Sequence, residues 1–168
     1  MVRWGQFTER RDPHGHPEFE RFPLRNHFQK GGRICLPLPN TKLTGAEEVL
    51  PLYAAVGWTN YTENPDMLRR AFENSLLVLA AREGERLLGI LRCVGDGASV
   101  VFLQDLLVYP ERQRQGVGTA LFQTMLGRFP AVYQLELLTD ATGKTDAFYR
   151  AQGLLPAEEI GCRAYIRM

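Results

Sequence analysis

The chain has 168 residues, of which 45% are hydrophobic and 23% charged, and its formal net charge is +1. These values fit a single soluble globular domain and exclude both a disordered chain and a dedicated nucleic-acid binder, which would carry a clear basic excess. Because no apolar stretch is long enough to cross a membrane, no secretory signal is evident and the scattered cysteines form no disulfide or zinc motif, we expect a cytoplasmic protein.

Residues 1–32 are expected to form an irregular N-terminal arm, and residues 33–168 a single domain. The arm is rich in Arg, His, Pro and Phe but shows neither helical nor strand periodicity. Its His14 and His16 form an HxH pair without further evident ligands, whereas a zinc site usually needs three or four protein ligands. A solvated loop is therefore the favoured interpretation, and no metal is expected.

The domain is predicted to begin with a short strand over Arg33–Leu38, followed by a helix. Thr44 and Glu47 form a T-x-x-E capping box ahead of apolar residues that are spaced like one face of a helix. Pro51 would lie in the first turn of this helix or kink it, and Gly57 is its expected end.

A second helix and a three-stranded meander are predicted next. Asn64 followed by Pro65 is a typical helix start, with an N-cap and then a proline at the first helical position. Apolar runs separated by glycine-containing turns predict three antiparallel strands at Leu76–Ala81, Leu87–Val94 and Ser99–Tyr109. The third run is apolar on both faces, so we expect a central strand that is covered on each side.

The remainder of the chain alternates between helices and strands. Gly116–Leu126 has the spacing of an amphipathic helix, and it is followed by a predicted strand at Val132–Leu138, a helix at Lys144–Gln152 and a last strand at Gly161–Arg167. Strands that are first antiparallel and then interleaved with helices predict an α+β fold with a mixed sheet covered on both faces.

The junction between the central strand and the following helix has the pattern of an anion site. Gly116 and Gly118 lie where the helix begins, and without side chains the backbone N–H groups can approach an anion closely, with the helix dipole favouring negative charge. Arg112 or Arg114 would add a charge-assisted contact. The spacing therefore predicts a cradle for a phosphate or a pyrophosphate.

Two well-known phosphate cradles are excluded by single residues. A dinucleotide-binding GxGxxG would need glycine at the position of Leu121. The run Gly143–Thr145 imitates the end of a P-loop, but the first glycine of that motif would fall at Leu138.

The segment Gln113–Gly118 does match the pattern Q/R-x-x-G-x-G/A, and it resembles the acyl-CoA pyrophosphate loop of the GNAT superfamily of N-acetyltransferases. The later run Ala147–Leu154 looks like the family's F-Y-x-x-x-G-F element, with Leu154 replacing the usual Phe. Leu52–Tyr61 resembles a bacterial subgroup of small GNAT proteins, mostly of undefined substrate. Together these matches cover about residues 33 to 168.

The resemblance implies an acetyl-CoA-dependent N-acetyltransferase that moves an acetyl group to a primary amine by direct attack in a ternary complex. It also implies the GNAT fold: a central, mostly antiparallel sheet of about six or seven strands, splayed at the middle and flanked by about four helices. The pantetheine of acetyl-CoA would bind between Leu106–Val108 and Gln134–Leu138 like an added strand, and amides from Gln113 to Thr119 would receive the pyrophosphate. The cofactor-binding residues implied in this way are Leu106, Leu107, Val108, Gln113, Arg114, Gln115, Gly116, Val117, Gly118, Thr119, Thr142 and Phe148.

In the resemblance, Tyr149 matches the family's general acid, which returns a proton to the departing thiolate. A residue that packs its ring on the sheet is the structural alternative. Thr142 stands where relatives have an Asn that holds pantetheine, and its hydroxyl would have to substitute for that amide.

The general base is left open by the sequence. Many relatives have a Glu on the strand before the last helix, and Leu137 stands at that position here. Asp105 is the better candidate, because a carboxylate in a central apolar strand is costly to bury unless it faces a cavity or a partner. The alternatives are a structural Asp105 that is hydrogen-bonded to residues 59–64, and a water chain from the acceptor pocket.

The acceptor pocket is expected around the first two helices, where an aromatic wall suits an amine through apolar contact or a cation–π interaction. Its candidate residues are Trp58, Asn60, Tyr61 and Phe102, and core packing is an equal interpretation of Trp58 and Phe102.

Two other functions compete with the enzyme. A CoA-binding sensor or regulatory module without turnover is suggested by the missing Glu at Leu137, and a purely structural or partner-binding domain is the third hypothesis. The sequence also allows a homodimer in which Gly161–Arg167 exchanges or pairs across a two-fold axis.

Overall fold

The computed structural model describes residues 46–167. The predicted arm with its HxH pair, the predicted strand at Arg33–Leu38 and Thr44 of the capping box lie outside the described residues. The described helices and strands are α1 (Ala46–Ala55), α2 (Thr59–Thr62), α3 (Pro65–Glu73), β1 (Leu77–Glu83), β2 (Arg86–Gly95), β3 (Val100–Val108), α4 (Val117–Arg128), β4 (Gln134–Leu137) and α5 (Gly143–Ala151), with short 3-10 turns at Pro110–Arg112 and Ala157–Ile160.

Local signals in the sequence set the bounds of the first helices. Gly57 adopts a φ of +81°, which favours glycine, and its amide bonds the Ala54 carbonyl as α1 ends. Asn64 caps α3 as predicted, with its side-chain oxygen accepting the Met67 amide at 3.1 Å. Pro51 lies in the interior of α1 rather than in its first turn.

The four strands of the described sheet follow the order β1-β2-β3-β4. The first three strands are antiparallel, as predicted, whereas β4 runs parallel to β3. The register shifts once in each antiparallel ladder, which leaves Leu88 as an extra residue in β2 and Gln104 as an extra residue in β3. Such β-bulges change the face to which the following side chains point.

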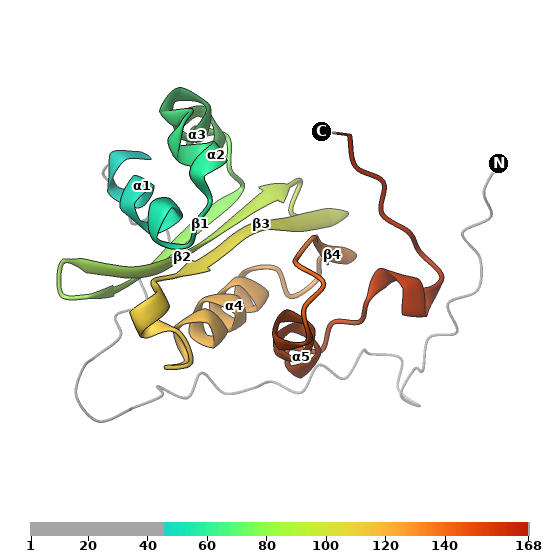
Figure 1. Ribbon diagram of the computed structural model, residues 1–168. Coiled ribbons are helices and arrows are strands. Elements are labelled where there is room, and N and C mark those ends of the chain that lie inside the picture. The colour runs from blue at the N-terminus through green and yellow to red at the C-terminus, as the bar shows by residue number, and fades with distance from the viewer. Residues whose placement is uncertain (1–45, 168) are drawn as a thin grey trace. The chain divides into compact units, whose positions relative to one another are not determined.

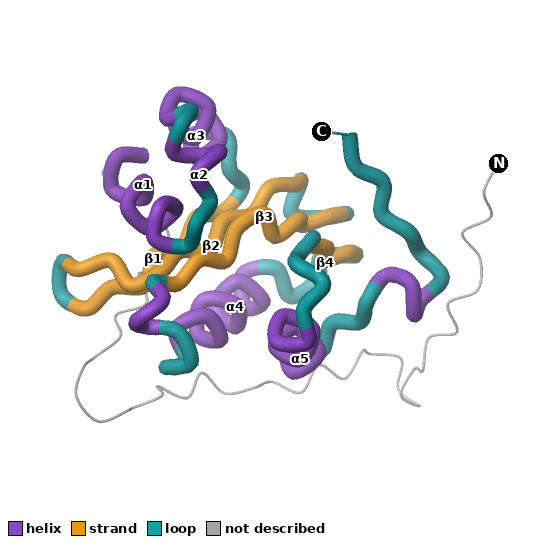
Figure 2. Tube along the Cα trace, viewed as in Figure 1, coloured by secondary structure: helices purple, strands orange, loops and turns teal. Residues whose placement is uncertain are grey.

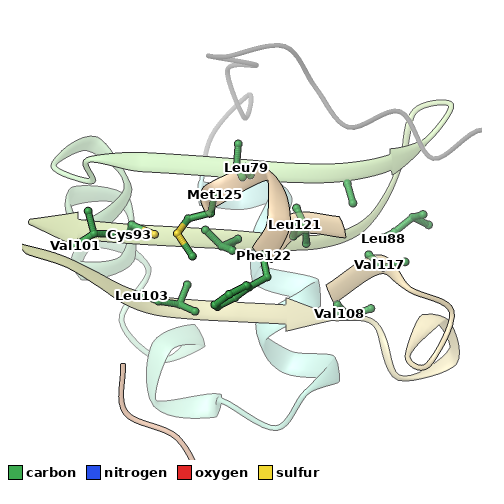
Figure 3. Packing of buried hydrophobic residues seen from close by; sticks show 12 residues of the cluster. Leu79, Leu88, Cys93, Val101, Leu103, Val108, Val117, Leu121, Phe122 and Met125 are labelled. Atoms are coloured by element: carbon green, nitrogen blue, oxygen red, sulfur yellow. The ribbon is translucent and has the colours of Figure 1, made fainter. Parts of the chain in front are cut away.

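Helices cover the sheet on both faces, as Figures 1 and 2 show. One face carries α1–α3, whose Val49, Leu52, Tyr53 and Leu68 pack with Ile90 and other residues of the sheet. The other face carries α4, and Figure 3 shows its Val117, Leu121, Phe122 and Met125 against buried strand residues such as Cys93 and Leu103. This two-sided core explains why β2 and β3 read as nearly continuous apolar runs.

The bulge at Gln104 shifts the alternation of β3 side chains between the two faces of the sheet by one residue. Before it, Val101 and Leu103 pack in the α4 cluster. After it, Leu107 packs with α1–α3 while Val108 returns to the α4 cluster. Asp105 therefore points to the layer of α1–α3, where it meets Tyr53.

The prediction of a last strand at Gly161–Arg167 is wrong for the described structure. After the turn at Ala157–Ile160, residues 162–167 have no regular secondary structure, and the described sheet has four strands rather than six or seven. The segment meets no strand edge, and Tyr165 is 87% exposed. No helix among residues 46–167 is long and apolar enough to span a membrane.

Candidate active site

The sheet opens between β3 and β4. Their parallel ladder joins Val100 to Gln134 and ends at the pair Leu103–Leu137, just before the bulge at Gln104. The second half of β3, Leu106–Val108, pairs with β2 only. One edge of these residues is therefore free of strand partners within the described sheet, as the predicted splay requires.

The loop that follows β3 presents unbonded amides at the start of α4. Arg114 adopts a φ of +59° and Gly116, the N-cap of α4, a φ of +83°. Within the described part of the chain, the amides from Arg114 to Thr119 donate no hydrogen bond, and the first bonded amide is that of Ala120, to the Gly116 carbonyl at 2.9 Å. Such amides at a helix N-terminus form a ready site for an anion.

The Gln113 amide departs from this pattern. It donates to the Pro110 carbonyl at 3.3 Å, so the free amides begin one residue later than predicted. The Gln113 side chain instead contacts the open strand edge, since its amide nitrogen donates to the Val108 carbonyl at 3.2 Å. A polar donor thus fits on the exposed edge of β3.

Positive charge gathers at the same loop, though not from every predicted residue. Arg112 is paired with Glu83 at 2.7 Å, whereas Arg114 is exposed and makes no ion pair within residues 46–167. Lys144 of α5 brings a second cation, because its Nζ lies 3.4 Å from Oε1 of Gln113. Sequence reasoning missed Lys144, which it noted only as part of a false P-loop.

Close packing holds the loop, α5 and the strand edge together. A Cβ at Gly118 would lie 3.8 Å from both the Phe148 ring and the Val108 side chain, which is van der Waals contact. A larger side chain at Gly118 would separate α4 from these neighbours. The glycine therefore allows α4 to pack closely against Phe148 and Val108.

Tyr149 lies on the α4 side of the sheet. Its half-buried ring contacts Phe122 and Phe148 with centroid distances of 6.1 Å and 5.1 Å. Burial raises the pKa of its phenol, against a weaker opposite effect of a hydrogen bond with Thr139, the second residue after β4. The phenol is therefore protonated at neutral pH, as a general acid must be.

Thr142 forms the N-cap of α5. Its hydroxyl oxygen accepts the Thr145 amide at 3.3 Å and lies 2.9 Å from the Thr145 hydroxyl. Because the Thr145 hydroxyl donates its one proton to the Asp140 carbonyl at 2.6 Å, the Thr142 hydroxyl is the donor in its contact with Thr145, and its proton is already in use.

Asp105 lies in a buried network on the opposite face of the sheet from Tyr149. Its Oδ2 accepts hydrogen bonds from the Tyr53 hydroxyl at 2.7 Å and from Nε of Arg92, while its Oδ1 has no partner in the described structure. The side chains of Asp105 and Arg92 are 0% and 5% exposed. These partners, and not the loop at residues 59–64, are the groups that hold the carboxylate.

Tyr53 joins this network to an aromatic cluster. Its ring centroid lies 5.1 Å from Tyr61 and 6.1 Å from Trp58, and the Trp58 and Tyr61 rings stack at 5.6 Å. Trp58 is 36% exposed, so part of the cluster faces solvent. Burial and the adjacent Asp105 carboxylate raise the pKa of the Tyr53 phenol far above its usual value.

The other two predicted acceptor residues make no ring contact with this cluster within residues 46–167. Asn60 is an exposed residue of α2, next to Tyr61 in the chain. Phe102 is half-buried on β3, where it pairs with Val94 and Glu136. It belongs to neither buried cluster.

A sheet that opens between two parallel strands, beside a helix start with free amides, places the chain among the acetyltransferases of GNAT fold. The model of the acetyltransferase (GNAT) domain matches residues 44–168, and the chain belongs to this family. The family takes its acyl group from acetyl-CoA, so the protein is an acetyltransferase. No curated protein matches the sequence.

Solved structures agree with this assignment. A GNAT-family acetyltransferase from Streptococcus pneumoniae TIGR4 is 41% identical, with a TM-score of 0.71, over 80% of this chain and 97% of that chain. A protein of unknown function from meticillin-resistant Staphylococcus aureus shares the fold at 20% identity, with a TM-score of 0.64, over 82% of this chain and 100% of that one. An aminoglycoside acetyltransferase from an uncultured soil sample shares it at 22% identity, with a TM-score of 0.52, over 80% and 93% of the two chains.

Proposed function

We propose that the protein transfers the acetyl group of acetyl-CoA to a primary amine by direct attack in a ternary complex. The observation that carries this proposal is the juxtaposition of an open strand edge at Leu106–Val108 with unbonded amides from Arg114 to Thr119. An extended tail that ends in a diphosphate has the chemistry to use both at once.

The pantetheine and the pyrophosphate of acetyl-CoA each have a counterpart in the chain. The pantetheine amides bond the free edge of β3, and the Gln113 side chain, which now donates to the Val108 carbonyl, moves aside for them. The pyrophosphate takes the loop amides, while Arg114 and Lys144 supply opposite charge.

In this proposal the general acid lies on one face of the sheet and the amine approaches from the other. Tyr149, on the α4 side, donates its proton to the departing thiolate, because burial keeps its phenol protonated. The amine approaches from the aromatic cluster of Tyr53, Trp58 and Tyr61, whose faces attract a cationic group before it loses its proton.

The base has two routes in this proposal. Asp105 would accept the proton at its unpartnered Oδ1, which requires the amine or a water to reach a carboxylate that is now fully buried. A water chain from the aromatic cluster to solvent would remove the proton without Asp105. The dependence of kcat/KM on pH, compared between the protein and its Asp105→Asn variant, separates the two routes.

Calorimetric titration with acetyl-CoA, followed by turnover assays on a panel of amines, tests the proposal. The panel should include polyamines, aminoglycosides, small metabolite amines and peptide N-termini. We expect micromolar binding of acetyl-CoA and release of free thiol with at least one class of amine. Absence of acetyl-CoA binding would contradict the whole proposal.

A CoA-binding sensor without turnover is the second candidate. Two observations favour it: Leu137 replaces the family's carboxylate, and Asp105 is already engaged by Arg92 and Tyr53. This candidate predicts the same titration result but no thiol release above the rate of spontaneous hydrolysis, with every amine in the panel.

A further inference from the structure

The β1–β2 hairpin reaches past the end of β3, to the place where the chain turns toward α4 (Figure 1). The strand β3 ends at Val108, which pairs with Gly89 of β2. Glu83 and Arg86, which pair with each other at the tip of the hairpin, therefore lie beyond the end of β3. There their side chains meet the 3-10 turn at Pro110–Arg112.

Two ion pairs of opposite polarity join the hairpin to this turn. The Glu83 carboxylate accepts a hydrogen bond from Arg112 at 2.7 Å, and Arg86 donates one to Glu111 at 2.8 Å. We call these four residues the hairpin clasp. Because the hairpin and the turn each contribute one acid and one base, a turn that slid along the hairpin would bring like charges together. The two pairs therefore fix one position of the turn.

The clasp also acts on the loop that carries the unbonded amides at the start of α4. The Glu111 carbonyl accepts the side-chain amide of Gln115 at 2.8 Å, and Gln115 directly precedes Gly116, the N-cap of α4. Amides that make no bond within the described part of the chain do not hold their own loop in place. The position of this loop therefore depends on side-chain contacts such as these.

The clasp is compatible with a bound donor, whereas another contact of the loop is not. On the proposed function, the bond from the Gln113 side chain to the Val108 carbonyl breaks when pantetheine takes the edge of β3. The clasp uses neither that edge nor the unbonded amides, so it can persist in the complex. Its pair between Arg112 and Glu83 is the more sheltered one, with side chains that are 24% and 41% exposed.

We propose that Glu83 and Arg86 are positioning residues for the donor: through Arg112 and Glu111 they hold the loop where it receives the pyrophosphate of acetyl-CoA. This inference rests on the proposed function. Arg112, which the sequence offered as a phosphate contact, then acts by holding the loop. When the clasp is broken, the apparent Kd of acetyl-CoA rises with the fraction of molecules whose loop is displaced.

Removal of an acidic residue tests the proposal by the sign of its effect. By charge alone, loss of a carboxylate near an anion site tightens binding, whereas loss of the clasp weakens it. Glu83→Gln and Glu111→Gln each break one pair of the clasp. Glu85→Gln is the matched control at the hairpin tip, since the Glu85 side chain makes no ion pair within residues 46–167.

Calorimetric titration of each full-length chain with acetyl-CoA gives the Kd values. Relative to Glu85→Gln, we expect a Kd about twofold to fivefold higher for Glu83→Gln and for Glu111→Gln, and about tenfold higher for the double variant. A lower Kd for Glu83→Gln would show that Glu83 withholds Arg112 from the diphosphate. That result overturns the proposal, and so do Kd values equal to that of Glu85→Gln.

Hydrogen exchange of the free protein follows the loop without any ligand. The amides of Arg112 and Gln113 bond the carbonyls of Tyr109 and Pro110, at 2.8 Å and 3.3 Å. They should exchange faster in Glu83→Gln than in Glu85→Gln, while the two melting temperatures stay within about 2 °C, because exposed ion pairs add little to global stability. Equal exchange in the two variants overturns the proposal.

Failure of the inference can be distinguished from failure of the proposed function. A protein that binds no acetyl-CoA would contradict both. Binding by the protein with a Kd that is insensitive to Glu83→Gln and Glu111→Gln would contradict the inference alone.

Discussion

Asp105 is a buried carboxylate whose neighbours are fixed before any substrate arrives. Arg92 and Tyr53 both bond its Oδ2, and Arg92 also lies 5.5 Å from the centroid of the Phe72 ring. We predict that Asp105→Asn lowers the free energy of unfolding by about 3–5 kcal/mol, because it leaves the Arg92 guanidinium buried without its counter-ion. Urea unfolding followed by circular dichroism measures the change.

Tyr53→Phe is the matched comparison for that loss. It removes one hydroxyl and keeps the ring, so its cost should be about 1–2 kcal/mol. The double change Arg92→Met with Asp105→Leu should cost less than Asp105→Asn alone, since no buried charge is left unpaired. Equal losses for Asp105→Asn and Tyr53→Phe would show that the ion pair contributes little to stability.

Tyr149 has the protonation state that its proposed role needs. We predict that Tyr149→Phe lowers kcat about 10²-fold or more and leaves the Kd of acetyl-CoA within a factor of about two. The phenylalanine keeps the ring contacts with Phe122 and Phe148, so the loss would come from the proton. Stopped-flow kinetics and calorimetry together give the two constants.

The pH profile of the same pair of proteins checks the assignment. Burial raises the Tyr149 pKa above its ordinary value of 10.0, and an acid works only while it is protonated. Activity that depends on this phenol therefore persists through neutral and mildly alkaline pH and falls only above that value. A kcat for Tyr149→Phe equal to that of the protein would reduce Tyr149 to a packing residue.

Two cationic side chains, Arg114 and Lys144, lie at the loop before α4, where we propose that the pyrophosphate of acetyl-CoA binds. We predict that Arg114→Ala and Lys144→Ala each weaken acetyl-CoA binding about threefold to tenfold, as expected for the loss of an exposed charge-assisted contact of about 1 kcal/mol. The effect should shrink as salt is raised, because exposed charges are screened. Arg128→Ala, at the opposite end of the same helix, is the control and should leave the Kd unchanged.

The turn between β2 and β3 is held by one carboxylate. Asp96 accepts the amides of Ala98, Ser99 and Val100 and the hydroxyl of Ser99, and these bonds lower its pKa from the ordinary 3.8. A depressed pKa means that the stabilisation is present at neutral pH and is lost as the pH falls below that ordinary value. We predict that the melting temperature of Asp96→Asn falls less steeply than that of the protein below about pH 4.

Local signals predicted most of the elements, and long-range pairings account for the rest. Asn64, Gly57 and the glycine turns act within a few residues, so the helix ends and the β1–β2–β3 meander were found with errors of a few residues at their ends. The bulge at Gln104 depends on how β2 and β3 align, and no glycine or proline beside it in the sequence indicates a bulge. The last strand was expected from its alternation alone, and alternation does not say which edge a strand will find.

The candidate site was predictable to the same extent. Gly116 and Gly118 lie in one short run with the loop, so the sequence alone could predict an anion site there, and the structure has unbonded amides at that place. Lys144 reaches that loop from α5, and the partners of Asp105 come from α1 and β2. These contacts join residues that are far apart in the chain, and the patterns of a single sequence do not indicate which distant residues meet in the fold.

For the molecule as a whole, the donor should stabilise the fold by mass action. At a concentration of 100 times its Kd, a ligand that binds only the folded state contributes about 2.7 kcal/mol. We predict that acetyl-CoA at this excess raises the melting temperature by about 5–10 °C, given the usual dependence for a domain of this size. Differential scanning fluorimetry measures the shift.

Adenosine diphosphate is the matched ligand for that experiment, because it has a diphosphate but no pantetheine. It should raise the melting temperature less than acetyl-CoA at the same concentration, since it leaves the edge of β3 empty. An equal shift for both ligands would mean that the gap between β3 and β4 contributes nothing to binding.

The bulge at Gln104 also divides β3 into two halves that differ in how they pair with neighbouring strands. Before Gln104, β3 pairs with β2 on one edge and with β4 on the other. After Gln104, β3 pairs with β2 only, and the faces to which successive side chains point are exchanged. The free edge of β3 consists of main-chain groups, so it tolerates most side-chain mutations, whereas Trp58 and Tyr61, on the α1–α3 side of the sheet, present side chains that can change. On the proposed function, changes in those side chains would alter the choice of acceptor and leave the backbone contacts to acetyl-CoA as they are.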